Sequence, residues 1–555
     1  MSENPGTPLI VQSDHSLMMD VHDPGFEVAR GEISPFAELE KSPEHMHTYR
    51  ISPLSLWNAA SAGLTPSHIT ETLDKWSRFP VPENVKYQIT DTISRFGKLV
   101  LHPGPEEGQL YLEITEEYIR KELPGHKSLQ KYLVPYENGF LIEFLHRGTI
   151  KQALIKLGYP VKDEVPLRPG DPLDVKLIET TKSGKPFNIR DYQKDASNSF
   201  LGDGKPGSGF GALVLPCGAG KTIIGIDVMV KLGMKTLILA TNVAAARQWM
   251  REIIDKTSLT EDEVGEYSGR SKEIKPVTVA TYQVITWRPD KNHPFPHFPI
   301  FHKENWGLII YDEVHLLPAP VFRVTAEIQA IRRLGLTATL IREDGREDEV
   351  FCLVGPKRYD VPWKDLEARG WIAEANCKEI RVPLPEDLMM KYATATPRTG
   401  YRIACENPVK IEVAKYLLKH HRGEPTLVIG QYLTQLKELS DALNAPIITG
   451  KTPNSKREEL FGAFRNGEIK VLVVSKVANF SIDLPDASIA IQVSGTFGSR
   501  QEEAQRLGRI LRPKERSSYF YSLVSSFTSE ETFGANRQKF LTEQGYKYTI
   551  EQWDS

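Results

Sequence analysis

The sequence predicts an α/β protein in which two parallel-sheet domains follow one another, preceded by smaller α+β domains. Two observations support this prediction: short β-branched strands alternate with helices beyond Phe187, and a second series of the same kind comes after the first. Such alternation is typical of parallel sheets that helices cover on both faces. The expected strands are Ala212–Leu215, Thr236–Ala240, Val277–Thr281 and Leu308–Tyr311 in the first series, and Thr426–Ile429, Pro446–Ile448, Val471–Val474, Ile489–Val493 and Tyr519–Val524 in the second.

Length, charge and cysteine content limit the class of protein. With 555 residues the chain is too long for a single core, and about three or four domains are expected. Its net charge of −3 gives no global electrostatic reason to bind nucleic acid, so any such binding must rely on local surfaces. The four cysteines form no C-x-x-C pair, which argues against a zinc site and against a disulfide framework.

The sequence gives no sign of a membrane or export segment. No apolar run approaches the ~20 residues that a membrane-spanning helix needs. The first residues, Met1 to Gly6, lack the basic and apolar regions of a signal peptide. We therefore expect a cytoplasmic protein without a membrane partner, and because nothing in the sequence demands a dimer we expect a monomer.

Residues 1 to about 90 carry no recognisable chemistry. They contain one strand-like run, Pro8–Gln12, and helical segments that glycine and proline interrupt. Three more strand-like runs follow at Lys98–Leu101, Leu110–Ile114 and Phe140–Leu145, before the Pro/Gly-rich linker Val165–Pro172. We therefore expect domains over 1–90, 91–170, 183–360 and 361–530, with a C-terminal tail over 531–555.

The stretch LVLPCGAGKT at 213–222 predicts a buried strand, a glycine turn and the start of a helix. Gly218 and Gly220 let the backbone turn tightly, so that successive amide N–H groups and the helix N-terminus face one anion. Lys221 can reach the β- and γ-phosphates of a nucleotide, and the Thr222 hydroxyl can ligate Mg²⁺. The alternative is an ordinary strand–turn–helix whose glycines only make the turn.

Two adjacent carboxylates, Asp312 and Glu313, follow the apolar strand Leu308–Tyr311. A carboxylate at the carboxyl end of a strand lies near a phosphate loop of the same sheet. Asp312 can hold the Mg²⁺ shell, and Glu313 can orient or deprotonate an attacking water. Taken alone, the pair is as well explained by an acidic strand end; its place after the phosphate loop favours catalysis.

Three polar residues, Gln505, Arg509 and Arg512, share one face of a helix expected in the second parallel-sheet domain. A guanidinium from a second domain stabilises charge on a transferring γ-phosphoryl group, as arginine fingers do. A solvated basic helix face is the alternative. Together with the phosphate loop and the carboxylates, these residues predict ATP hydrolysis that depends on closure of two domains.

In this order along the chain, the motifs resemble those of superfamily 2 helicases and specifically the XPB helicases, which are DNA-repair and transcription-factor ATPases. The matching stretches are Arg190–Gln193, Leu215–Thr222, Asp312–His315, Leu336–Leu340 and Gln505–Arg512. Leu215 stands where the general phosphate-loop pattern has its first glycine, and the start Leu-Pro-Cys is itself similar to the XPB version.

Further stretches narrow the resemblance. Arg342–Asp344 is similar to the R-E-D element of the family, and Gly355–Tyr359 with Gly370–Ala373 resembles its entry into the second motor domain. Ser475–Ala487 resembles the fifth motif, although Ala478-Asn479 stand in place of a Gly-Asp pair. The resemblance is strong over about 185–525 and weaker over 1–160, which are similar to the N-terminal and damage-recognition regions of prokaryotic XPB proteins. A bacterial type is expected.

The resemblance implies two RecA-like motor domains with ATP and Mg²⁺ as cofactors. It implies a nucleotide-binding set made of Arg190, Gln193, Pro216, Cys217, Gly218, Ala219, Gly220, Lys221, Thr222 and Asp483, in which Gln193 reads adenine. It implies Thr222 and Asp312 as the metal ligands. It implies coupling and DNA contacts by Thr241, Gln248, Thr337, Thr339, Arg342, Glu343 and Asp344.

A thumb-like insertion is expected at about 383–405, where XPB proteins carry one. Met389, Met390 and Tyr392 of this segment could wedge against DNA. A small amphipathic helix that packs locally is the equally good alternative.

The family implies an ATP-dependent 3′–5′ DNA helicase or translocase that couples hydrolysis to DNA opening in DNA repair. The implied partner is single-stranded, forked or damaged DNA, and the expected location is the nucleoid in the cytoplasm. A nuclease is a possible further partner, whose existence the sequence does not reveal. The rival functions are a duplex translocase with little unwinding, a non-catalytic DNA-binding scaffold and a nuclease subunit. The motifs alone do not separate DNA from RNA, and the family favours DNA.

Overall fold

The computed structural model describes residues 6–41, 45–204, 207–216, 218–290, 293–329, 331–338, 347–361, 366, 369, 375–475, 487–495, 518–534 and 548–553. The chain forms two compact units: Met1–Val214 with Gly220–Asp360, and Leu215–Ala219 with Val361–Ser555.

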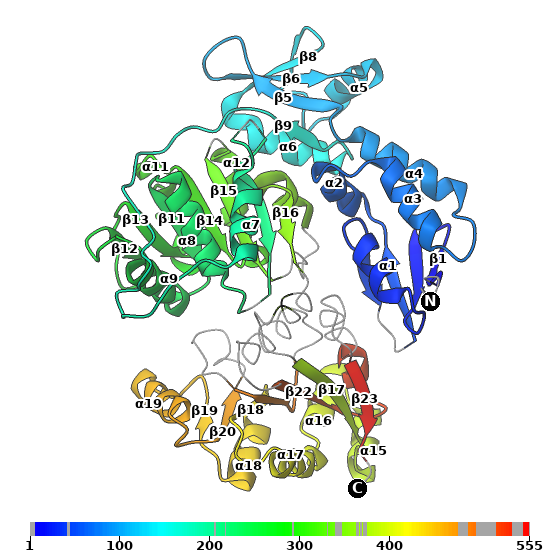
Figure 1. Ribbon diagram of the computed structural model, residues 1–555, viewed down its shortest axis with the longest axis vertical. Coiled ribbons are helices and arrows are strands. Elements are labelled where there is room, and N and C mark those ends of the chain that lie inside the picture. The colour runs from blue at the N-terminus through cyan, green and yellow to red at the C-terminus, as the bar shows by residue number, and fades with distance from the viewer. Residues whose placement is uncertain are drawn as a thin grey trace. The chain divides into compact units, whose positions relative to one another are not determined.

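The first unit begins with an antiparallel four-stranded sheet in the order β1-β2-β4-β3 (Figure 1). Its strands are β1 (Leu9–Val11), β2 (Ser16–Asp20), β3 (Glu38–Lys41) and β4 (Met46–Arg50), and its helices are α1 (Phe26–Ile33), α2 (Pro53–Ser61), α3 (Pro66–Trp76) and α4 (Glu83–Arg95). The sequence predicts only the first of these strands, because the others contain few β-branched residues and give no propensity signal.

A five-stranded sheet follows, in the order β7-β8-β6-β5-β9. Its strands are β5 (Leu99–Pro103), β6 (Gln109–Ile114), β7 (Val134–Tyr136), β8 (Gly139–Glu143) and β9 (Val161–Asp163), and its helices are α5 (Glu117–Glu122), η1 (Leu123–Gly125), η2 (Phe144–His146) and α6 (Arg147–Lys156). The three strand-like runs expected here form β5, β6 and β8.

The linker expected at Val165–Pro172 packs against the part of the chain that follows it. Val165 and Leu173 are buried, and the Leu173 amide donates a hydrogen bond of 2.8 Å to the carbonyl of Gly233. Asp171 also forms an ion pair of 3.0 Å with Lys235. The segment is therefore held along its length, although it has no regular secondary structure.

The rest of the first unit is a parallel seven-stranded sheet in the order β12-β13-β11-β14-β15-β10-β16. The strands are β10 (Phe210–Val214), β11 (Thr236–Ala240), β12 (Val264–Tyr267), β13 (Val277–Thr281), β14 (Leu308–Asp312), β15 (Arg332–Thr337) and β16 (Lys357–Asp360). The helices are α7 (Asp191–Leu201), α8 (Lys221–Leu232), α9 (Val243–Lys256), α10 (Tyr282–Ile285), α11 (Ile300–Lys303), η3 (Val314–Leu316), α12 (Ala319–Glu327), α13 (Glu347–Glu349) and η4 (Val350–Val354). Figure 1 shows α7 and α8 lying against the strands, and α8 packs on β15 and α9.

The second unit holds another parallel seven-stranded sheet, in the order β19-β20-β18-β21-β22-β17-β23. Its strands are β17 (Ala375–Val382), β18 (Thr426–Gly430), β19 (Ile447–Ile448), β20 (Val471–Ser475), β21 (Ile489–Gln492), β22 (Ser518–Ser525) and β23 (Tyr548–Gln552), and its helices are α15 (Glu386–Thr394), α16 (Pro397–Cys405), α17 (Val409–His420), α18 (Leu433–Leu443) and α19 (Asn454–Arg465). The two parallel sheets follow smaller α+β regions along the chain, which confirms the predicted fold class.

The C-terminal end of the chain differs from the expected tail. Tyr548–Gln552 pair in parallel with β17 and form the last strand of the second sheet. This strand is exposed along most of its length, since it lies at the edge of the sheet. An edge strand needs no continuous apolar face, and its sequence therefore reads as a polar tail.

A buried charge cluster fastens the five-stranded sheet to the first parallel sheet. Arg147 and Lys151 of α6 bind the carboxylate of Asp163 at 2.7 and 2.9 Å, and all three side chains are at most 5% exposed. Lys151 also donates to Gln329 Oε1 at 3.0 Å, on the segment after α12. Burial alone would raise the pKa of Asp163, but Lys151 and Arg147 together hold the pKa below its usual value.

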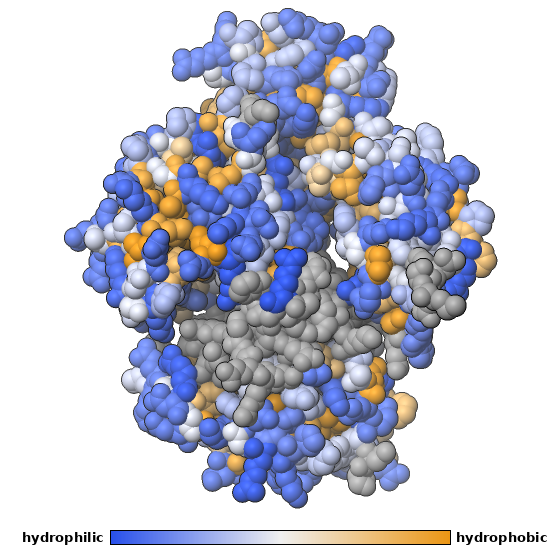
Figure 2. Space-filling view, in the orientation of Figure 1, coloured by the Kyte–Doolittle hydropathy of each residue, from blue (hydrophilic) through white to orange (hydrophobic). Residues whose placement is uncertain are grey.

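Hydrophilic residues cover most of the first unit's surface on the face seen in Figure 2. Large apolar side chains with high exposure, such as Tyr87 at 75% and Trp287 at 52%, come from separate elements. Scattered exposed apolar residues of this kind are ordinary in globular proteins. Among the helices that the structure describes, none is both long enough and apolar enough to cross a bilayer.

We predict that Asp163→Ala lowers the free energy of unfolding of the first unit by about 3–5 kcal/mol, because Arg147 and Lys151 are left buried without a counter-charge. Denaturant unfolding followed by fluorescence measures the change. The matched control is Glu117→Ala, which breaks an ion pair whose two side chains are 70% and 76% exposed and should cost less than about 1 kcal/mol. Similar losses in the two variants would contradict the role of the cluster.

The same cluster gives a pH dependence with a defined sign. The folded-state pKa of Asp163 is depressed, so its stabilising contribution is present above the unfolded value of about 3.9 and is lost as the pH falls below it. Acid unfolding of wild type and Asp163→Asn should therefore converge below that pH. A constant difference down to strongly acidic pH would contradict this.

Candidate active site

The glycine turn after β10 has the backbone that the phosphate-loop prediction requires. Gly218 and Gly220 have φ angles of +84° and +77°, in the left-handed region that favours glycine. Gly220 is the N-cap of α8, so Lys221 and Thr222 are the first residues of that helix. The Ala219 amide donates to the carbonyl of Pro216 at 3.2 Å, which closes the turn.

The expected adenine-reading residue lies against this turn. The buried Gln193 side chain accepts a hydrogen bond of 3.0 Å from the Arg190 amide through Oε1. A Cβ atom added to Gly220 would lie 2.5 Å from Gln193 Nε2, so the amide group contacts the last glycine of the loop. The first turn of α7 and the phosphate loop therefore adjoin one another.

Lys221 and Glu313 form an ion pair across the end of the sheet. The distance between Lys221 Nζ and Glu313 Oε1 is 3.2 Å, and the two side chains are 10% and 17% exposed. Glu313 has a φ angle of +49°, a conformation that costs a non-glycine residue about 1–3 kcal/mol and is concentrated at functional sites. The predicted phosphate-binding lysine and the predicted catalytic carboxylate thus meet in the structure.

Asp312 is the last residue of β14 and is held from two sides. Its Oδ2 accepts a hydrogen bond of 3.0 Å from the indole N–H of Trp249, and its backbone carbonyl accepts one of 3.0 Å from the Tyr282 hydroxyl. Burial, together with the neighbouring charge of Glu313, raises the pKa of Asp312 to about 6. Trp249 and Lys221 act in the opposite direction and limit this rise.

The pKa of Glu313 shifts in the opposite direction. Burial favours its neutral form, but the charges of Lys221 and His315 outweigh burial and hold its pKa below the usual value. Neighbouring carboxylates whose pKa values are pushed apart can take different roles. Glu313 is therefore suited to remain a carboxylate and accept a proton or a hydrogen bond from water.

Thr337 connects the carboxylates to the next strand. Its hydroxyl lies 2.6 Å from His315 Nδ1, and this nitrogen lies 3.5 Å from Glu313 Oε2. Thr337 and His315 are both buried. The two contacts connect the end of β15 to Glu313.

Three further candidate residues, Thr222, Thr241 and Gln248, lie within the described part of the chain but make no contact there with the other candidate site residues that would indicate their role. Thr222 is half-buried on α8, and Gln248 is half-buried on α9. Thr241 precedes the N-cap residue Asn242 of α9, whose side-chain amide donates to the Thr241 hydroxyl at 3.2 Å. The candidates that lie outside the described residues are Cys217, Thr339, Arg342, Glu343, Asp344, Asp483, Gln505, Arg509 and Arg512.

Trp249, His315 and Tyr282 belong to the site although the sequence did not single out their roles. His315 carried a signal as the last residue of the matching stretch Asp312–His315. Trp249 carried a weaker one: with Ala246 and Ile253 it forms the buried stripe of α9 at helical spacing. That stripe indicates a core residue, and the hydrogen bond to Asp312 follows only from the tertiary structure.

The oxygen donors of Thr222 and Asp312 fit Mg²⁺. Magnesium prefers hard oxygen ligands and commonly takes one or two from the protein, with phosphates and water completing its shell. In the part of the chain that the structure describes, no group of three or more His, Cys, Asp or Glu side chains is arranged to hold a metal ion.

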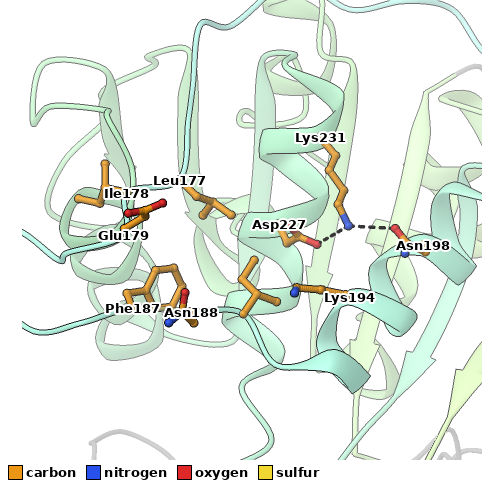
Figure 3. A pocket seen from close by; sticks show the side chains of 10 residues that line it. Leu177, Ile178, Glu179, Phe187, Asn188, Lys194, Asn198, Asp227 and Lys231 are labelled. Atoms are coloured by element: carbon orange, nitrogen blue, oxygen red, sulfur yellow. Dashed lines mark hydrogen bonds and ion pairs between the residues drawn. The ribbon is translucent and has the colours of Figure 1, made fainter.

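A separate cavity of about 590 Å³ lies beside α7 and α8 (Figure 3). Phe187 and the 177–179 segment line one side, and Lys194 and Lys231 line the other. Lys231 is held by Asp227 at 2.7 Å and by Asn198 at 3.0 Å, as the dashed lines show. None of the described residues predicted to bind nucleotide lines this cavity.

In the second unit, the segment expected to be a thumb consists of α15 and α16, which pack on each other. The Tyr392 hydroxyl accepts a hydrogen bond of 2.7 Å from the Ser529 amide, on the segment after β22 of the same unit. Met390 is 70% exposed. Tyr392 is therefore bound within the second unit, whereas Met390 is accessible on α15.

Three family models match parts of the chain. A family model described as ERCC3/RAD25/XPB C-terminal helicase matches residues 366–553. Models described as type III restriction enzyme, res subunit, and as helicase conserved C-terminal domain match residues 186–342 and 9–136.

Curated relatives match along nearly the whole chain. The chain is 51% identical to a DNA 3′-5′ helicase XPB of Mycobacterium tuberculosis, with 99% of this chain and 98% of the relative covered. It is 50% identical to the protein of the same name from Kineococcus radiotolerans, with 98% and 96% covered. It is 34% identical to the general transcription and DNA repair factor IIH helicase/translocase subunit XPB of Encephalitozoon cuniculi, with 98% and 82% covered.

We predict that Gly220→Ala weakens the binding of ADP, because an added Cβ would meet Gln193 Nε2 at 2.5 Å and displace it. Isothermal titration with ADP measures the loss. The matched control is Gly233→Ala at the other end of α8, where φ is +57° and the Cβ would lie at an ordinary 3.4 Å from the Leu173 carbonyl. Both variants should lose about 1 kcal/mol of stability to backbone strain, and equal loss of ADP affinity would contradict the contact.

Proposed function

The chain belongs to the XPB family of DNA helicases, and we propose that it is an ATP-driven motor that moves 3′ to 5′ along DNA and opens it during DNA repair. The observation that carries this proposal is the meeting of Lys221, Asp312 and Glu313 at the carboxyl edge of the first parallel sheet, beside Gln193. Open parallel sheets bind their ligands at this edge. The relatives named DNA 3′-5′ helicase XPB support the substrate and the polarity.

The residues divide the work of ATP hydrolysis among them. The glycine turn and the N-terminus of α8 would bind the phosphates, with Lys221 on the β- and γ-phosphates and Gln193 on adenine. Glu313, ionised beside Lys221, would accept a hydrogen bond from the attacking water and orient it. Thr222 and Asp312 would hold Mg²⁺, which when bound neutralises the charge that develops on the phosphate oxygens.

We infer that Gln505, Arg509 and Arg512 complete the site when the two motor domains close on nucleotide, and that Asp483 belongs to the motif that links them. Thr241 and Gln248, with Thr339 and the Arg342–Asp344 element, would contact or sense DNA. Contacts of this kind to the phosphate backbone are independent of sequence and local, which suits a chain with a net charge of −3.

The finer assignments of partner and place are part of the same proposal. We propose single-stranded, forked or damaged DNA as the substrate, a monomer as the working state and the nucleoid in the cytoplasm as the location. A nuclease partner is a further hypothesis. The relative from Encephalitozoon cuniculi, named as a subunit of a DNA repair factor, supports the link to repair.

A duplex translocase that opens DNA only locally is the second candidate. It is favoured by the relatives that are named helicase/translocase rather than helicase alone. Both candidate motors use the same ATP site. They differ in whether they separate the two DNA strands or move along the duplex and open it only locally.

We predict that Lys221→Ala and Glu313→Gln each reduce DNA-stimulated ATP hydrolysis by about 100-fold or more, the usual cost of removing a group that stabilises or positions the reacting phosphate. Hydrolysis is measured with and without single-stranded, forked and duplex DNA. Lys231→Ala, which alters a lysine at the far end of α8, is the control and should keep the stimulation. Hydrolysis that is absent under every condition while DNA still binds would leave the scaffold function instead.

Strand displacement separates the two candidate motors. A helicase should release a labelled strand from a fork with a 3′ single-stranded tail and not from one with a 5′ tail, at a rate that follows ATP hydrolysis. A duplex translocase should hydrolyse ATP on blunt duplex and displace a triplex-forming strand with little strand release. Release from the 5′-tailed fork alone would contradict the proposed polarity.

A further inference from the structure

Trp249 joins two parts of the first motor domain that are distant in sequence. It lies on α9 and is 2% exposed, and its indole N–H donates to Asp312 Oδ2 at 3.0 Å. The far edge of the same ring reaches α8, because a Cβ added to Gly225 would lie 2.6 Å from Trp249 Cη2. One rigid side chain therefore contacts the phosphate-loop helix and the end of β14 at once.

A hydrogen bond between these groups has a specific effect on the carboxylate. An ionised carboxylate only accepts hydrogen bonds, and an indole N–H only donates, so the pair favours charged Asp312 in one orientation. A carboxylate has room for about four such contacts, so this bond leaves acceptor capacity for a cation. The Tyr282 hydroxyl bonds the backbone carbonyl of the same residue and restricts the strand end as well.

We propose that Trp249 is a positioning residue that holds the carboxylate of Asp312 in the orientation in which it receives Mg²⁺. The inference rests on the proposed function, in which Asp312 is a metal ligand. Outer partners that orient ligating carboxylates commonly change metal affinity by about 10- to 100-fold when they are removed. Gly225 is part of the arrangement, because any side chain there would occupy the space of the indole ring.

The alternative is that Trp249 only fills the core, and the chain offers a matched control for it. Trp306 is fully buried in the same motor domain, and its indole N–H donates to a backbone carbonyl, that of Ile300, at 2.8 Å. Trp306→Phe therefore removes a buried indole hydrogen bond that does not involve Asp312. Trp249→Phe keeps an aromatic ring and removes the donor to Asp312.

The test measures binding rather than turnover. ADP is titrated into wild type, Trp249→Phe and Trp306→Phe by calorimetry, first in EDTA and then over a series of Mg²⁺ concentrations. We expect Trp249→Phe to keep the wild-type affinity for ADP in EDTA and to need about 10- to 100-fold more Mg²⁺ for the half-maximal gain in affinity. Trp306→Phe should match wild type in both measurements.

Gly225→Ala provides a second route to the same answer if Trp249→Phe folds poorly. It leaves both hydrogen-bonding partners in place and displaces the ring from the α8 side, so it should raise the Mg²⁺ requirement in the same direction. A folded Trp249→Phe or Gly225→Ala variant with the wild-type Mg²⁺ requirement would overturn the proposal. Loss of ADP affinity in EDTA by the same factor as in Mg²⁺ would overturn it too, since that result indicates a distorted phosphate loop. Failure of the proposed function is distinct, because wild type itself would then show no DNA-stimulated ATP hydrolysis.

Discussion

The active site depends on keeping two adjacent carboxylates, Asp312 and Glu313, in a partly buried position at the end of one strand. Burial and mutual repulsion both favour the protonated form of a carboxylate, and each therefore acts against the negative charge of this pair. Lys221 compensates Glu313 at 3.2 Å, and the indole of Trp249 compensates Asp312 at 3.0 Å. Burial and the charge of Glu313 still raise the pKa of Asp312 to about 6, whereas Lys221 and His315 hold the pKa of Glu313 below its usual value, so the two carboxylates are chemically distinct before any ligand binds.

The parallel sheet supplies the positions for these partners. In a parallel sheet the carboxyl ends of all strands lie at one edge, and the loops that follow them can meet there. Asp312 at the end of β14 pairs with Leu336 on β15, and Thr337 pairs with Val214 at the end of β10. His315 can therefore reach Thr337, and Glu313 can reach Lys221, although the members of each pair are far apart in sequence. The strand order, rather than sequence proximity, brings the site together.

The sequence was sufficient for several interior strands of the two sheets, but not for β15, which lies between β14 and β10 and begins with two arginines. Thr236–Ala240 and Val277–Thr281 occur at the predicted residues, because buried parallel strands are continuous β-branched runs. Edge strands such as Tyr548–Gln552 were not predictable in this way, since exposure on an edge permits polar residues. The glycine turn and the carboxylate pair could be read as motifs, because their chemistry requires fixed residue types at short spacing.

Partners that come from other elements could not be read from the sequence. The contact of Gln193 with Gly220 and the hydrogen bond of Trp249 to Asp312 join residues that only the fold brings together. The roles of Gln505, Arg509 and Arg512 remain predictions from the motif, since those residues lie outside the described part of the chain.

The position of α9 gives the contact of Trp249 a consequence beyond the orientation of Asp312. The helix starts directly after β11, so its N-terminus lies at the same edge of the sheet as the phosphate loop. Its buried stripe of Ala246, Trp249 and Ile253 is fixed in the core, whereas Gln248 on the same helix is only half-buried. A flexible side chain between α9 and Asp312 would absorb a small shift of the helix by rotating. An indole ring packed against Gly225 cannot do so, and a shift of α9 must therefore move the carboxylate or break the hydrogen bond. We proposed that Thr241 and Gln248 contact DNA. If that contact shifts α9, the shift reaches Asp312 through the single rigid contact of Trp249, rather than through a long series of weak contacts.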